Sequence, residues 1–269
     1  MKAFLGDMEI KKQFILRLKD SVKTGRLKKG IGWTGSEGCA IGCTLYKYNS
    51  QAFETELGIP AVLARLEDYY YENLDAPLFE DWPVRFLDAI EPGADLSLAA
   101  LNFFYSEMTN LTEKIQMRER NERRGVAKLI ENTLGVLGDA NLMLSSALDG
   151  KKIPMTSWED IQFRTLDLSN DWAWEAIHGN NLGEAWAHEA TVRSAVWATE
   201  FTQIMFFPET AGNIKDRPSK LAEAFVLSSA RSLAWRSESE ISCSYGAASR
   251  SAVMDQSERL LAVLKGKIK

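Results

Sequence analysis

Residues 30–68 read GIGWTGSEGCAIGCTLYKYNSQAFETELGIPAVLARLED and contain the densest glycines and two of the three cysteines of the chain. Within this stretch Gly58 has the position of a helix C-cap, and Pro60 has that of the first residue of the next helix. The pattern predicts a loop, a short helix, a turn and a second helix over about 60–74. It is also where we first look for a ligand or partner site.

The glycine spacing of residues 30–35, GIGWTG, matches the letters of a dinucleotide-binding fingerprint. That fingerprint requires a strand before it and a helix after it within a βαβ unit. A helix precedes it instead, because Ile10, Phe14, Leu18 and Val22 recur every four residues over 8–23. A P-loop fails as well, since Ser36-Glu37 stands where Lys and Ser/Thr are needed. We therefore interpret the glycines as a loop that uses positive φ angles.

Basic residues follow the first predicted helix. Arg26, Lys28 and Lys29 are candidates for steering an anionic ligand. The alternative is an ordinary solvated face.

Cys39 and Cys43 are spaced i,i+4, one helical turn apart, which could seed a metal site, a redox pair or a nucleophile. The remaining Cys and His residues are distant, so buried free thiols are the simpler interpretation. Glu54, Glu56 and Arg65, with Glu67 and Asp68, could transfer protons or bind a divalent ion. The simpler interpretation of these charges is a paired, exposed surface. The catalytic candidates are Cys39, Cys43, Glu54, Glu56 and Arg65.

The runs GCAIGCTLY, FETELGIPAVLARLEDYYYENL and WPVRFLDAIEPGADLS resemble a group of bacterial and phage-type proteins without a known activity. The resemblance covers roughly residues 1–110 and the helical style of the tail. That group often has His after the CTL tripeptide, where this chain has Tyr46. The resemblance implies a bacterial or phage setting and no mechanism.

The second half begins after the candidate linker 149–152, where Thr156 and Glu159 have the spacing of a capping box. Alanine, serine and tryptophan dominate from there, and Trp186 and Trp197 are expected on one core-facing side of a helix. Glu175, His178, Glu184 and His188 are the candidate metal ligands. Because residues 179–181 break the helix between the two pairs and no second E-x-x-H occurs, we expect no metal and no cofactor.

The chain has 269 residues, of which 45% are hydrophobic and 26% charged, so it can bury a core. No convincing period-two alternation occurs, and the prediction is an all-α protein. We expect an irregular multi-helix domain over 1–150, packed on a helical hairpin or bundle over 151–269, and the two can share one core. The net charge of −5 disfavours nucleic acid. The absence of a long apolar run disfavours a membrane span, and the three cysteines favour a reducing, cytoplasmic setting.

Three functions remain open. The first is a non-catalytic helical protein that binds another protein, phage or mobile-element encoded and acting on a host protein. The second is an enzyme or small-molecule binder with its site on residues 30–68. The third is a metal protein that uses Glu175, His178, Glu184 and His188. No complete catalytic motif is present, so we favour the first, with a protein partner and an open oligomeric state.

Overall fold

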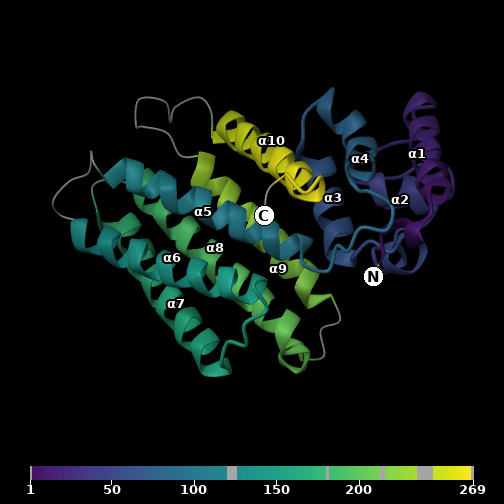
Figure 1. Ribbon diagram of the computed structural model, residues 1–269. Coiled ribbons are helices and arrows are strands. Elements are labelled where there is room, and N and C mark those ends of the chain that lie inside the picture. The colour runs from purple at the N-terminus through teal and green to yellow at the C-terminus, as the bar shows by residue number, and fades with distance from the viewer. Residues whose placement is uncertain (1, 120–125, 180–181, 213–215, 235–244, 268–269) are drawn as a thin grey trace. The chain divides into compact units, whose positions relative to one another are not determined.

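The structure, a computed structural model, describes residues 2–119, 126–179, 182–212, 216–234 and 245–267 (Figure 1). Every regular element in these ranges is a helix, and the extended backbone forms only isolated bridges. The all-α prediction is confirmed. None of the helices in these ranges is both long enough and apolar enough to cross a membrane.

The chain forms two compact units, each described here by itself. Unit 1 comprises residues 1–100 and 253–269, and unit 2 comprises residues 101–252. This division differs from the expected boundary at residue 150. The physical reason is that α6 (Ala127–Leu148) packs on α7 (Met155–His178) and α8 (Leu182–Phe206), so residues 101–150 join the second half.

Unit 1 is an irregular group of mostly short helices. Asp7 caps the first long helix by accepting the backbone N–H of Glu9 at 2.7 Å. Arg85 of the fourth helix donates to Glu258, which places the end of the last helix in this unit. Its helices are η1 (Ala3–Gly6), α1 (Met8–Lys23), α2 (Ala40–Leu45), η2 (Phe53–Leu57), α3 (Ala61–Asn73), α4 (Leu78–Ala89) and the C-terminal part of α10 (Tyr245–Leu264).

The glycine-rich loop before α2, together with Gly42 in α2 itself, uses glycine for two different reasons. Gly30 and Gly35 have positive φ angles of 71° and 102°, as predicted. Gly38 and Gly42 are needed for close approach instead. An added Cβ atom at these positions would lie 2.4 Å and 2.0 Å from the carbonyl oxygen of Gly32.

Unit 2 is built around α8, which packs against α6, α7, α9 (Arg217–Ala234) and η3 (Pro208–Ala211). Its buried alanines, such as Ala195 and Ala198, let these neighbours approach closely. The unit also contains nearly all of α5 (Ala99–Glu119), a single long helix. The capping box at Thr156 does not form, because α7 already begins at Met155, after Pro154.

The tryptophans of unit 2 divide between core and surface. Trp158 and Trp172 of α7 are fully buried. The expectation of core packing is wrong for Trp186, which is 45% exposed, and Trp197 is half-buried.

Candidate functional site

The five catalytic candidates of unit 1 do not converge on one cavity. Glu54 Oε1 accepts the backbone N–H of Ala61 at 2.9 Å and so supports the start of α3. Glu56 forms an ion pair with Lys47 at 2.5 Å. Each carboxylate therefore has its own partner within unit 1, and the two do not share a site.

Cys39 and Arg65 are brought together through Tyr48, which the sequence did not single out, and through Asp68, which it named only beside the five catalytic candidates. Arg65 Nη1 donates to the Tyr48 hydroxyl at 2.7 Å, and that hydroxyl donates to Asp68 Oδ2 at 3.2 Å. The thiol of Cys39 interacts with the same Asp68 carboxyl group through a side-chain hydrogen bond. The result is a polar chain from a half-buried arginine to a buried cysteine.

Neither cysteine of this region is activated as a nucleophile. Burial raises the pKa of the Cys39 thiol, and the Asp68 carboxylate raises it further. Burial also raises the pKa of Cys43, whose thiol donates to the carbonyl oxygen of Gly38 at 3.3 Å. Both side chains are buried and reduced, and at neutral pH both remain thiols. Cys243 lies outside the described residues.

The prediction of exposed charge is wrong for Glu67 and Asp68, which are 1% and 8% exposed. Glu67 Oε2 and Asp68 Oδ1 have no hydrogen-bond partner with good geometry among the described residues. Burial raises the pKa of both carboxyl groups, and it also raises the pKa of Glu72. The helical pattern could have identified Glu67, because it lies four residues after Leu63 and three before Tyr70, within the apolar stripe.

The candidate anion-binding residues are largely engaged within unit 1. Arg26 pairs with Asp20, and Lys29 donates to the carbonyl oxygens of Glu72 and Leu74. Burial lowers the pKa of Lys29, against the opposing effect of Glu72. Of the three, only Lys28 is exposed and lacks such a contact with a described residue.

The four metal candidates do not form a ligand set. His178 stacks on Trp174 at 4.5 Å between ring centroids, and His188 stacks on Trp172 at 4.2 Å. Within the described part of the chain, no group of three His, Cys, Asp or Glu side chains could hold a metal ion. The two histidines instead pack against these two tryptophans of α7.

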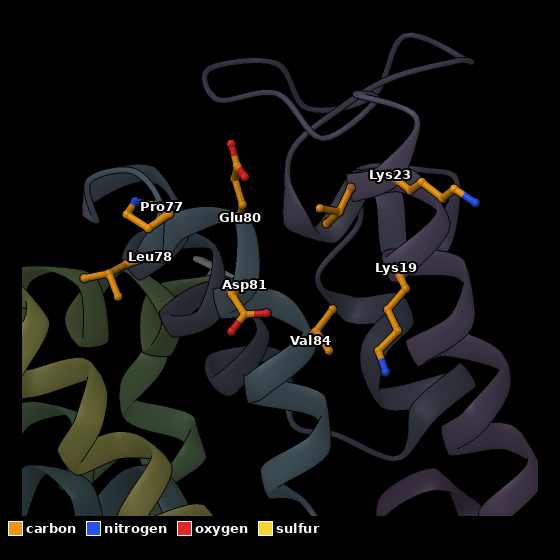
Figure 2. A pocket seen from close by; sticks show the side chains of 8 residues that line it. Lys19, Lys23, Pro77, Leu78, Glu80, Asp81 and Val84 are labelled. Carbon is orange, nitrogen blue, oxygen red and sulfur yellow. The ribbon is translucent and has the colours of Figure 1, made fainter.

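A surface groove of about 460 Å³ lies between α1 and α4 (Figure 2). Lys23 extends away from α4 in Figure 2, and all of the lining residues are exposed or half-buried. The groove is open, and no buried polar side chain lines it. Its lining consists of Lys19, Val22, Lys23, Pro77, Leu78, Glu80, Asp81 and Val84.

The outer face of α7 is the most unusual surface of the described chain. Phe163, Leu166, Trp174 and Ile177 are 72%, 50%, 61% and 68% exposed. At 3.6 residues per turn they fall within an arc of about 80°. No other described helix carries more than two large apolar residues that are exposed. We call these four residues the α7 face.

The opposite side of α7 is firmly held in unit 2. Trp172 Nε1 donates to Thr133 Oγ1 of α6 at 2.8 Å. Ser169 Oγ donates to Glu189 Oε1 of α8 at 2.9 Å, and Arg193 Nε donates to the same oxygen at 2.6 Å. These buried contacts fix the helix on which the α7 face lies.

His178 also orders the exposed end of this face. Its ring stacks on Trp174 with an interplanar angle of 21°, and its Nδ1 atom lies 3.0 Å from the Trp174 carbonyl oxygen. The indole of Trp174 is therefore held in place although most of it is exposed. A residue considered for metal binding thus orients a tryptophan.

Comparison with protein-family models, with curated proteins and with solved structures finds no match to this chain.

Proposed function

We propose that this is a non-catalytic helical protein that binds a helical segment of a different protein on the α7 face. The observation that carries the proposal is the exposed stripe of Phe163, Leu166, Trp174 and Ile177. Scattered exposed apolar residues are ordinary, but four of them within one arc of a single helix, interrupted only by the exposed Asn170, are typical of interaction sites. The resemblance to phage-type proteins makes a bacterial host protein the partner we expect.

The composition of α7 supports this proposal. Its inner side buries Trp158, Ile161, Leu168 and Trp172, so the helix is apolar on two opposite sides. An apolar side of a helix is normally packed against another element. The described residues cover only one side of α7, and a partner helix would cover the other.

The nature of the four residues supports it further. Aromatic side chains dominate the energetics of protein interfaces, and a rigid anchor loses little entropy on binding. Trp174 is such an anchor because His178 stacks on it. Phe163 lies at the other end of the stripe, about 16 Å away along the helix axis, at 1.5 Å per residue.

The test is site-specific photo-cross-linking in cells of the bacterial host. A benzophenone amino acid replaces Trp174 in one variant and Phe163 in another. Leu16 of α1, an equally exposed apolar residue at 66%, is the matched control position. We expect one protein to be cross-linked from both α7 positions and not from position 16.

The dependence on the α7 face is then checked with an unlabelled competitor. Excess wild-type protein is expected to suppress the cross-link, and the Phe163→Ser/Ile177→Ser variant is expected not to suppress it. This double variant should keep the wild-type melting temperature, because exposed positions contribute little to stability. Equal labelling from positions 174 and 16, or a cross-link within the same chain, contradicts the proposal.

A further inference from the structure

One edge of the α7 face is acidic. Asp160, Asp167 and Asp171 lie about 40–80° around the helix from Phe163. Asp160 is paired with Arg164, which also donates to Asp139 of α6 at 2.7 Å. Asp167 and Asp171 are exposed and form no salt bridge with a described residue.

This acidic edge is unfavourable for the isolated helix. Asp167 and Asp171 are spaced i,i+4, the separation at which like charges repel each other on a helix. α7 carries five carboxylates and a single arginine, and that arginine is already engaged. Cations from outside the described residues would relieve this repulsion.

We infer that the partner of the α7 face is a cationic amphipathic helix whose Lys or Arg side chains pair with Asp167 and Asp171. The inference rests on the function proposed above and adds the charge and shape of the partner. The apolar stripe of that helix covers Phe163, Leu166, Trp174 and Ile177, and its basic edge lies over the two aspartates.

The dimensions of the face define the length of the partner. The stripe extends over 14 residue steps, from Phe163 to Ile177, or about 21 Å at 1.5 Å per residue. A partner of four to five helical turns, about 14–18 residues, covers it. Helix-in-groove recognition uses apolar anchors at spacings of three, four and seven residues, which suit this stripe.

An antiparallel pairing with a second copy of this chain does not fit the charges. An antiparallel pair of α7 helices, face to face, would set the two Asp167–Asp171 edges side by side. Like charges across an interface suppress association. The acidic edge equally disfavours nucleic acid, whose phosphates require basic side chains.

The test uses the full-length protein and two synthetic peptides of about 18 residues, a length set by the helix rise. Both peptides have leucine or tryptophan at peptide positions 1, 4, 8, 12 and 15, which forms an apolar stripe along one side of the helix. One has lysines along the edge of this stripe and the other has glutamates at the same places. We expect the lysine peptide to bind at least about tenfold more tightly, because two edge ion pairs form.

Three further measurements assign this preference to α7. The Asp167→Asn/Asp171→Asn variant is expected to reduce the tenfold preference to about threefold or less. The charge-matched control, Glu80→Gln/Glu91→Gln in unit 1, keeps it. Replacing Trp174 by Ala weakens the binding of the lysine peptide by about 30-fold, the smallest loss typical of a hot-spot aromatic residue.

The inference is overturned if the glutamate peptide binds as tightly as the lysine peptide, or if neither peptide binds. It is also overturned if light scattering shows a dimer that Phe163→Ser dissociates, since a second copy then occupies the face. If the peptides fail but a different protein is still cross-linked from position 174, the proposed function stands and only the inference of a cationic helix is rejected. Failure of the cross-linking as well removes both.

Discussion

The carboxyl group of Glu67 is fully buried on α3, and its Oε2 atom has no hydrogen-bond partner among the described residues. Burial raises its pKa well above the ordinary value of 4.5, and the neighbouring Asp68 raises it further. The folded protein therefore holds a proton that the unfolded chain releases. The stability gained from this proton is fully present below the unfolded pKa and is lost as the pH rises through the folded pKa.

We predict that the free energy of unfolding falls as the pH rises from about 5 to about 8, and that Glu67→Gln reduces this fall. At about pH 8 the variant should be more stable than the wild type by about 1–3 kcal/mol, because the amide is neutral without a proton, whereas each pH unit above the unfolded pKa costs the wild type up to about 1.4 kcal/mol to keep its carboxyl group protonated. Urea denaturation at several pH values measures this. The control is Glu131→Gln on α6, an exposed carboxylate that should leave the slope unchanged. An unchanged slope in Glu67→Gln would mean that other groups carry the pH dependence.

The fate of single side chains was only partly predictable from the sequence. Helical periodicity places Glu67 in the apolar stripe of α3, so its burial could have been predicted. The contact of Tyr48 with Asp68 could not, because it joins a loop to a helix 20 residues away. Distances of that kind depend on how elements pack, which local patterns do not determine.

At the scale of elements, two helical glycines have opposite surroundings. Gly42 of α2 lies so close to the backbone of Gly32 that an added Cβ atom would be 2.0 Å from its carbonyl oxygen. Gly135 of α6 is exposed, and an added Cβ atom would meet nothing within 4 Å. The same substitution should therefore have opposite effects.

We predict that Gly42→Ala destabilises the protein by about 1–3 kcal/mol, since the neighbouring backbone must move. Gly135→Ala, its matched control, should stabilise it by up to about 1 kcal/mol because alanine is the better helix former. Thermal denaturation of both variants measures the two shifts. Equal shifts of the same sign would show that α2 accommodates the added methyl group and that the close contact is not a constraint.

The sequence predicted where helices lie better than it predicted which helices pack against one another. Asp7 and Pro60 mark the starts of α1 and α3 because capping and proline geometry act locally. The Thr156 capping box failed because Pro154 allows α7 to start earlier. The α7 face was missed for a different reason: an apolar pattern on both sides of a helix does not tell which side the fold buries.

At the scale of the whole molecule, the two units differ in how their helices are supported. Unit 1 combines a glycine-rich loop with mostly short helices and contains the buried carboxyl groups of Glu67 and Asp68. Unit 2 consists of long helices that pack around α8. Long-range packing, and not the composition change near residue 150, decided where one unit ends and the other begins.

The position of α8 in unit 2 predicts an order of local stability. Val192, Ala195, Ala198 and Phe201 are almost fully buried, and α8 packs against helices on several sides, so it can open only when its neighbours also open. α7 has one exposed side and can open while more of the unit stays folded. In native-state hydrogen exchange we expect amides in the middle of α8 to exchange at least about tenfold more slowly than those of α7. A bound partner on the α7 face should slow exchange in α7 and leave α8 unchanged, because α8 is already protected. Equal protection of the two helices in the free protein would mean that unit 2 opens only as a whole, and that the exposed side of α7 costs it no local stability.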